Sequence, residues 1–88
     1  MSLNNEHSKI PSIGRGIYVH NKTGNRYRVH GIALDTETGE AMVVYSPVIT
    51  AEYEYFVRPY TMFVENVELN GKILPRFSKV DEPKTFLV

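Results

Sequence analysis

The chain has 88 residues, of which 42% are hydrophobic, and its ten Lys and Arg residues balance its ten Asp and Glu residues. This length suits one small domain, and a net charge of zero does not support the strongly basic surface that is typical of nucleic-acid-binding domains. The chain has no cysteine, which excludes disulfides, thiolate metal sites and a cysteine nucleophile.

The two ends of the chain are expected to be tails that flank a single domain. Residues 1–14 are mostly polar and show no hydrophobic periodicity, so they predict a flexible segment, with a second tail over residues 81–88. The domain itself is expected over residues 15–80. No apolar run approaches the ~20 residues that span a bilayer, and the N-terminus lacks the order of a signal peptide. We therefore expect a cytoplasmic protein that makes no membrane contact.

The first half of the domain predicts a pair of strands. GIYVH, residues 16–20, is rich in residues that favour strands, and NKTGN, residues 21–25, suits a hairpin turn. Along the next strand, positively charged or ionisable residues alternate with apolar ones. The two rows are Arg26, Arg28 and His30 on one face and Tyr27 and Val29 on the other. Gly31 interrupts this alternation and predicts a β-bulge.

The second half predicts further short strands. AMVVYSP, residues 41–47, is apolar on both faces and is expected inside the sheet until Pro47 ends it. EYFVRP is a further strand, and PYTMF, residues 59–63, fits one helical or 3₁₀ turn. VENVEL and KILPRF flank Asn70-Gly71, which is the strongest hairpin signal in the chain.

These elements predict an all-β fold with almost no helix. About five to six short antiparallel strands, separated by regular turns, indicate a small barrel or sandwich. A 3₁₀ turn before a late strand favours a small SH3-like barrel. In such a barrel Tyr27, Val44 and Phe63 are expected in the core, whereas Arg26 and Arg28 face outwards. We expect the resulting basic row to be a solvated face rather than a nucleic-acid contact.

Several short motifs follow one another in a specific order from Gly16 to Phe77. They fall on Gly16, Tyr18, His20, Lys22, Gly24, Tyr27, Ala33, Glu37, Thr38, Val43, Val44, Tyr45, Phe56, Val57, Arg58, Pro59, Met62, Phe63, Pro75, Arg76 and Phe77. This order resembles DUF1653, a family of small bacterial domains of unknown function. The resemblance implies a small barrel in a bacterial cytoplasm, but no activity.

The sequence departs from the family pattern at a few positions. Thr23 is inserted where the pattern runs from Lys directly into Gly, Asn21 replaces an aromatic residue, and Phe56 stands where Trp is usual. The first change affects the turn next to His20. The other two remove aromatic surface that a ligand could use.

His20 is the first candidate site residue, because histidine titrates near neutral pH and can act as an acid, a base or a ligand. The interpretation we favour is a polar residue that ends the first strand, since no nucleophile accompanies it at a useful spacing. A two-histidine metal site with His30 would need carboxylates that the sequence does not place. We therefore predict no catalytic residue, no metal and no cofactor.

Glu37 and Arg58 are a second candidate pair. A carboxylate in a turn and an arginine just before a proline could form a bidentate ion pair that fixes the loops around a cleft. Arg58 could instead anchor an anionic ligand. We favour the structural ion pair over the anion anchor.

Two hypotheses about function remain. The first is a non-enzymatic interaction module that binds a peptide, a nucleotide or a nucleic-acid segment through a groove near Tyr45, Phe56 and Arg58. The alternative is a catalytic or metabolite-binding accessory domain in which His20, Glu37 and Arg58 share one polar pocket. We favour the module, because a small chain with no cysteine and no phosphate-binding loop has few ways to shield a reaction centre.

Overall fold

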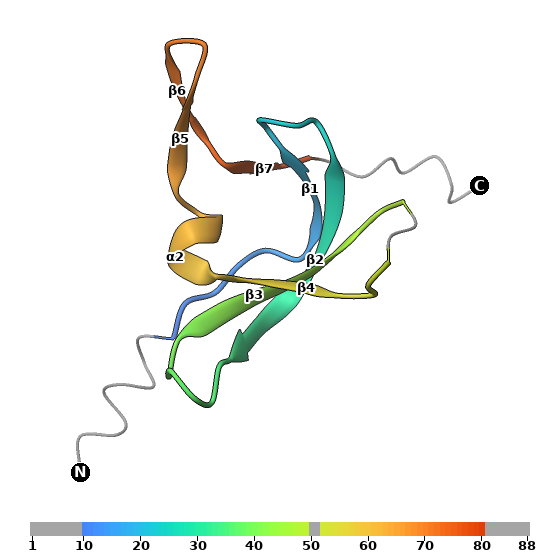
Figure 1. Ribbon diagram of the computed structural model, residues 1–88, viewed down its shortest axis with the longest axis vertical. Coiled ribbons are helices and arrows are strands. Elements are labelled where there is room, and N and C mark those ends of the chain that lie inside the picture. The colour runs from blue at the N-terminus through green and yellow to red at the C-terminus, as the bar shows by residue number, and fades with distance from the viewer. Residues whose placement is uncertain (1–9, 50–51, 81–88) are drawn as a thin grey trace.

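The structure, a computed structural model, describes residues 10–49 and 52–80. Its elements in chain order are β1 (Gly16–His20), β2 (Arg26–Leu34), β3 (Ala41–Pro47), β4 (Phe56–Pro59), α2 (Tyr60–Phe63), β5 (Asn66–Leu69), β6 (Lys72–Pro75) and β7 (Phe77–Lys79). The fold is all-β apart from the single turn of α2 (Figure 1). The described residues thus form seven strands, slightly more than the sequence predicts.

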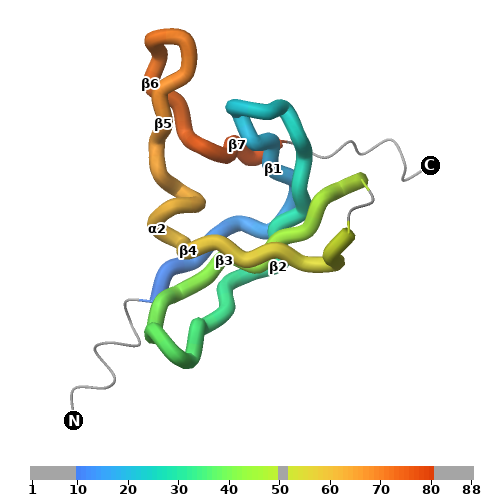
Figure 2. The backbone as a smooth tube through the Cα atoms, in the orientation of Figure 1, coloured from blue at the N-terminus to red at the C-terminus, as the bar shows by residue number. Residues whose placement is uncertain are grey.

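The strands form two antiparallel sheets. The larger sheet has the order β4-β3-β2-β1-β7, and the β5–β6 hairpin forms the smaller one. The larger sheet bends around one side of the molecule, while α2 and the β5–β6 hairpin stand along the other side (Figure 2). Its concave side is called the inner face below.

The larger sheet stays open, so the expected closed barrel is not found in the part of the chain that the structure describes. Its edge strands β4 and β7 are not paired with each other. β4 is short and ends at Pro59, which has no N–H to donate to a neighbouring strand, and the chain then leaves the sheet for α2. The gap between these two strands is called the seam below.

A bulge in β2 decides which side chains face inwards. Val29 lies opposite Tyr45, but Gly31 already lies opposite Val44, so β2 holds one extra residue at this point. The extra residue allows both Val29 and Ile32 to pack on the core side of the sheet. The bulge that the sequence predicts at Gly31 is therefore confirmed.

The alternation predicted for β2 is also confirmed. Arg26 and Arg28 are exposed, whereas Val29 between β1 and β3 is only 1% exposed. The basic row therefore lies on the outer face of the larger sheet.

The core is small and mostly aromatic. The buried hydrophobic residues of the described chain are Tyr18, Val29, Val43, Tyr45, Phe63 and Phe77. Phe63 of α2 stacks on Phe77 of β7 with ring centres 4.0 Å apart and planes 2° apart, and Tyr45 lies edge-on to both rings. This stack attaches the helical turn to the sheet. Phe63 is in the core as predicted, and Tyr27 packs against it while partly buried.

Val44 differs from the expectation, because it is only partly buried. The side chains of β3 alternate between faces, and the inner positions belong to Val43 and Tyr45. Both faces of this strand are apolar in the sequence, so the sequence pattern does not tell whether Val44 or its neighbours Val43 and Tyr45 face the core.

The turns agree better with the sequence than the burial of Val44 does, because a turn depends on the few residues that form it. Asn70 and Gly71 form the two-residue turn of the β5–β6 hairpin, with φ angles of 54° and 80° that are typical of a type I′ turn. Of the two forms that the sequence allows for residues 59–63, a helical or a 3₁₀ turn, α2 is an α-helical turn. The N–H of Val64 donates to the carbonyl of Tyr60 at 3.1 Å, and this four-residue spacing is that of an α-helix.

The folded part begins within the segment that the sequence predicts as a tail. Ile13 packs against the core, and the Tyr18 hydroxyl donates to the carbonyl of Gly14 at 2.8 Å. The rest of the predicted tails, residues 1–9 and 81–88, lies outside the described residues. Across the described ranges, no helix has the length and apolar character to cross a membrane.

Candidate functional site

Two of the predicted site residues meet at the ring of Phe77. His20 ends β1 and lies opposite Phe77 in the β1–β7 pairing, with its imidazole edge-on to that ring at 4.8 Å between centres. Arg58 reaches the same ring from β4, and its Cζ atom lies 5.7 Å from the ring centre. His20 and Arg58 therefore converge at the seam, although β1 and β4 are separated in the sheet by β2 and β3.

Tyr45 holds the guanidinium of Arg58 in place through a hydrogen bond. The Nε–H group of Arg58 donates to the Tyr45 hydroxyl at 3.3 Å, and Tyr45 itself is only 4% exposed. A guanidinium has five N–H groups, so this bond leaves those of the two terminal nitrogens for other partners. Tyr45, predicted as a groove residue, is therefore a buried support whose hydroxyl positions Arg58.

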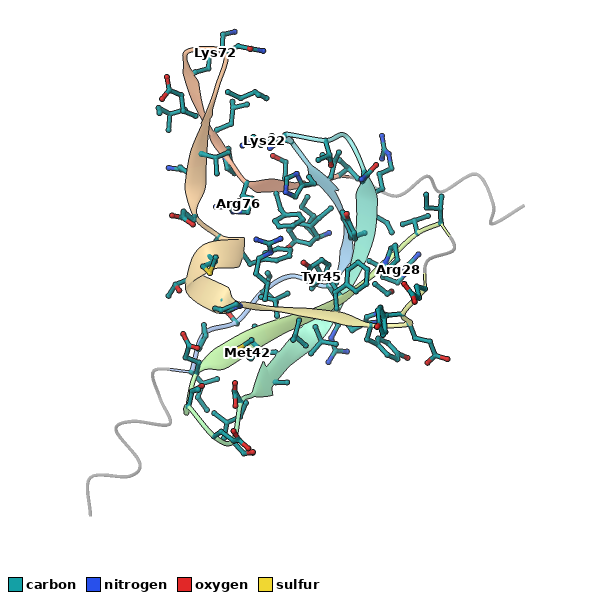
Figure 3. The ribbon with its side chains drawn as sticks, in the orientation of Figure 1. Lys22, Arg28, Met42, Tyr45, Lys72 and Arg76 are labelled. Carbon is teal, nitrogen blue, oxygen red and sulfur yellow. The ribbon has the colours of Figure 1, made fainter. Side chains whose placement is uncertain are left out.

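Arg76 is the residue between β6 and β7, and its charge lies close enough to His20 to act on that imidazole. Its Nε–H donates to the carbonyl of Met62 at 3.1 Å, and its Nη2 donates to a carboxylate oxygen of Glu65 at 3.0 Å. Lys22 belongs to the β1–β2 turn, Arg76 lies below it in the view, and Tyr45 lies deeper inside the curve of the sheet (Figure 3).

The surroundings of His20 lower its pKa below the usual value for histidine. Burial is the largest cause, because it disfavours the charged imidazolium, and the charges of Arg58, Arg76 and Lys22 act in the same direction. The imidazole is therefore neutral at pH 7. Its Nδ1 atom is buried and has no hydrogen-bond partner in the described structure.

An apolar hollow of about 420 Å³ opens at one end of the inner face. Its lining residues are Gly24, Asn25, Arg26, Tyr27, Pro47, Val48, Ile49 and Phe56. The rings of Tyr27 and Phe56 lie 6.2 Å apart, and Tyr27 also packs edge-on against Phe77 at 5.9 Å. The hollow and the seam thus adjoin the same group of aromatic rings, and of the predicted groove residues Tyr45, Phe56 and Arg58, Phe56 is in the lining of the hollow.

Glu37 does not join His20 and Arg58. It lies in the turn between β2 and β3, its side chain is exposed, and its N–H donates to Oδ1 of Asp35 at 2.9 Å. His20 pairs with Asn25 just before the other end of β2. A nine-residue strand spans roughly 30 Å, so the two turns are far apart. The expected Glu37–Arg58 ion pair and the three-residue polar pocket are therefore not formed.

His30 lies on the opposite face of the sheet from His20. Its Nε2 atom lies 2.8 Å from the Ser46 hydroxyl, and its ring stands edge-on to Tyr55 at 5.3 Å. The two histidines therefore cannot share one metal ion. Within residues 10–49 and 52–80, no group of three or more His, Cys, Asp or Glu is placed to hold a metal.

The chain is similar to proteins of one known family. The family model of DUF1653, described as a protein of unknown function, matches residues 16–79. The chain belongs to the DUF1653 family. A crystal structure of a DUF1653 protein from Bordetella bronchiseptica is similar to it, with a TM-score of 0.72 and 31% identity over 82% of this chain and 95% of that chain. No curated protein matches the chain.

The structure places two of the residues at which the sequence was expected to depart from the DUF1653 pattern. Asn21 donates its side-chain amide to the carbonyl of Pro75 at 2.7 Å and to the hydroxyl of Ser78 at 2.8 Å. It thereby ties the β1–β2 turn to β7. Phe56 lines the hollow.

Arg76 is not among the site residues that the sequence of this DUF1653 chain predicts. The closing Pro-Arg-Phe motif was the available signal, because it places an arginine directly before the core residue Phe77. The pairing of β7 with β1, which brings this motif next to His20, leaves no local signal in the sequence.

Proposed function

We propose that this DUF1653 domain is a non-enzymatic binding module that holds a flat or apolar group of a peptide, a nucleotide or a nucleic-acid segment in the hollow beside Phe56. The observation that carries the proposal is the hollow itself. It has about 420 Å³ of space, and the aromatic rings of Tyr27 and Phe56 belong to its lining. Small-ligand sites are usually apolar concavities of this size with a few polar groups.

The charge around the hollow supports a ligand that combines an apolar part with a negative part. Arg58 lies two residues from Phe56 on the same face of β4, so its positive charge is on the side of the sheet where the hollow opens. Aromatic surface next to arginine is a common means of binding bases and acidic peptides.

The alternative, a catalytic or metabolite-binding accessory built on His20, Glu37 and Arg58, has less support. Glu37 lies at the far end of β2 from His20, so it cannot orient the imidazole or exchange a proton with it.

We also propose that the fold is an SH3-like barrel that is left open along the seam. The support is the strand order, in which a four-strand meander is followed by a helical turn and the last strand returns to pair with the first. In this interpretation the β5–β6 hairpin is an insertion between the helical turn and the last strand.

The test of the binding proposal is chemical-shift mapping of the ¹⁵N-labelled chain against separate pools of short peptides, RNA and DNA oligonucleotides and nucleotides. We expect shifts to concentrate at residues 24–27, 48–49 and 56. Phe56→Ala is expected to weaken binding about tenfold or more, since one stacking contact contributes about 1–3 kcal/mol.

Val57→Ala is the matched control, because Val57 is 59% exposed and its side chain points to the other face of the same strand. This variant is expected to bind as the unmodified chain does. Equal loss of binding in both variants, or shifts that cluster on the outer face, would contradict the proposed site.

A further inference from the structure

Positive charge at the seam exceeds the negative charge that faces it. Arg58, Arg76 and Lys22 come from three different segments, and each acts on the imidazole of His20. In the described structure, the carboxylate in ionic contact with this group is that of Glu65, and it binds Arg76. The other two cations therefore have no carboxylate partner there. A partly buried guanidinium is normally paired, because burial of an unpaired charge is unfavourable.

The setting of Arg58 suits an oxyanion. The bond from Nε to Tyr45 and the contact with the Phe77 ring restrict the guanidinium, while the two terminal nitrogens form no hydrogen bond within the described residues. A restrained guanidinium presents parallel N–H groups, which match two oxygens of a phosphate. The Tyr45 hydroxyl can in addition donate its own proton.

The distance between the seam and the hollow limits which ligands can reach both Arg58 and Phe56. Phe56 and Arg58 are two residues apart on one face of β4, so about 7 Å separates their backbone positions. A ligand that fills both places has a flat ring, a short polar connection and an anionic group. A nucleoside monophosphate has these parts in this order, with its base, its ribose and its phosphate.

We propose that the seam is a phosphate site and that the domain binds a mononucleotide, with the base in the hollow beside Phe56 and the phosphate on Arg58. This inference rests on the proposed function and names its ligand class. The positive field of Arg76 and Lys22 supports the phosphate without direct contact. Longer nucleic acids and acidic peptides are the alternative ligands, and the chemical-shift mapping with peptide and oligonucleotide pools described above tests them.

The experiment measures the binding of adenosine 5′-monophosphate, adenosine and inorganic phosphate to the full chain by calorimetry and chemical-shift mapping. We expect the monophosphate to bind about ten- to a hundredfold more tightly than adenosine, since a charge-assisted hydrogen bond contributes about 1.5–3 kcal/mol. Arg58→Gln is expected to abolish this difference and to leave adenosine binding unchanged. Arg28→Gln, on the outer face, is the matched control and is expected to retain the difference.

The outcomes separate the two proposals. If adenosine and its monophosphate bind equally and both depend on Phe56, the hollow is a binding site as proposed, but the phosphate site at the seam is wrong. If neither binds while a peptide or an oligonucleotide does so in a Phe56-dependent way, the mononucleotide inference alone is wrong. If no ligand depends on Phe56, both proposals are wrong.

A second variant covers the case in which Arg58→Gln disturbs the fold, which the dispersion of the amide spectrum reports. Arg58→Lys keeps the charge but not the two parallel N–H groups, so it is expected to retain part of the preference for the monophosphate. The unmodified chain offers a further measurement. Monophosphate binding is expected to weaken as salt rises, whereas adenosine binding is not, and an equal response to salt would contradict the phosphate site.

Discussion

Phe56, Val57 and Arg58 are consecutive residues of an edge strand, yet they serve different faces of the sheet. Phe56 and Arg58 point to the inner face, where one lines the hollow and the other lies over Phe77. Val57 points outwards and is 59% exposed. An inward-pointing charge on an edge strand also hinders pairing with a second molecule, which is a structural role for Arg58 that does not exclude binding.

At the residue scale, we predict that His20 makes stability depend on pH. Its pKa is lowered in the fold, first by burial and then by Arg58, so the unfolded chain binds this proton more readily. The free energy of unfolding is therefore expected to rise with pH from the lowered pKa up to about pH 6.5, and to level off above it.

Urea denaturation between about pH 5 and pH 8 measures this effect. His20→Gln is expected to flatten the rise, because the titrating group is gone, while His30→Gln on the outer face is expected to keep it. An unchanged slope in His20→Gln would show that another group is responsible.

At the element scale, the β5–β6 hairpin is the most local structure in the chain. Among the described residues its two strands pair with each other and not with the larger sheet, and they are joined directly by the turn at Asn70 and Gly71. Both turn residues have positive φ angles, which Gly adopts without cost and Asn tolerates. The hairpin therefore forms from a few neighbouring residues, whereas the larger sheet needs β7 to return to β1.

Gly71→Ala is expected to destabilise this hairpin by about 1–2 kcal/mol, because an L-residue with a side chain is strained at this φ. Hydrogen exchange of the hairpin amides is expected to accelerate by about tenfold, with little change in β2. Gly71→Asn is the control and is expected to cost less. Equal acceleration in β2 would show that the hairpin and the larger sheet unfold together.

At the scale of the whole molecule, stability depends on a few aromatic contacts. A domain of this size buries little surface, and its core contains a stacked pair, Phe63 and Phe77, with Tyr45 against both rings. Phe63 is 1% exposed and is the buried residue of α2. The loss of this ring would also disturb the seam, because Phe77 contacts both His20 and Arg58.

Phe63→Ala is therefore expected to cost about 3–5 kcal/mol, a large part of the total stability of a small domain. The thermal midpoint, followed by near-ultraviolet circular dichroism, is expected to fall by more than about 10 °C. Met62→Ala, at a neighbouring position that is 43% exposed, is expected to change the midpoint far less. Similar losses in both variants would contradict the central place of the Phe63–Phe77 stack.

Much of the candidate site could not be predicted from sequence patterns. Phe56 and Arg58 were predicted only as residues of one groove, and the β3–β4 register places both on the inner face of the larger sheet. The burial of Tyr45 and the partial exposure of Val44 could not be read, since both faces of β3 are apolar. Glu37 was grouped with His20 by chemical type alone, and the length of β2 separates them.

The order of the residues alone was enough to specify the family, the antiparallel strands, the bulge in β2 and the turn at Asn70 and Gly71. Each of these depends on contacts among residues a few positions apart, or on motifs that follow one another in order. The open seam and the meeting of His20, Arg58 and Arg76 around Phe77 arise only from the folded chain. The pairing of β1 with β7 joins segments more than fifty residues apart, and the packing of the whole core selects that pairing.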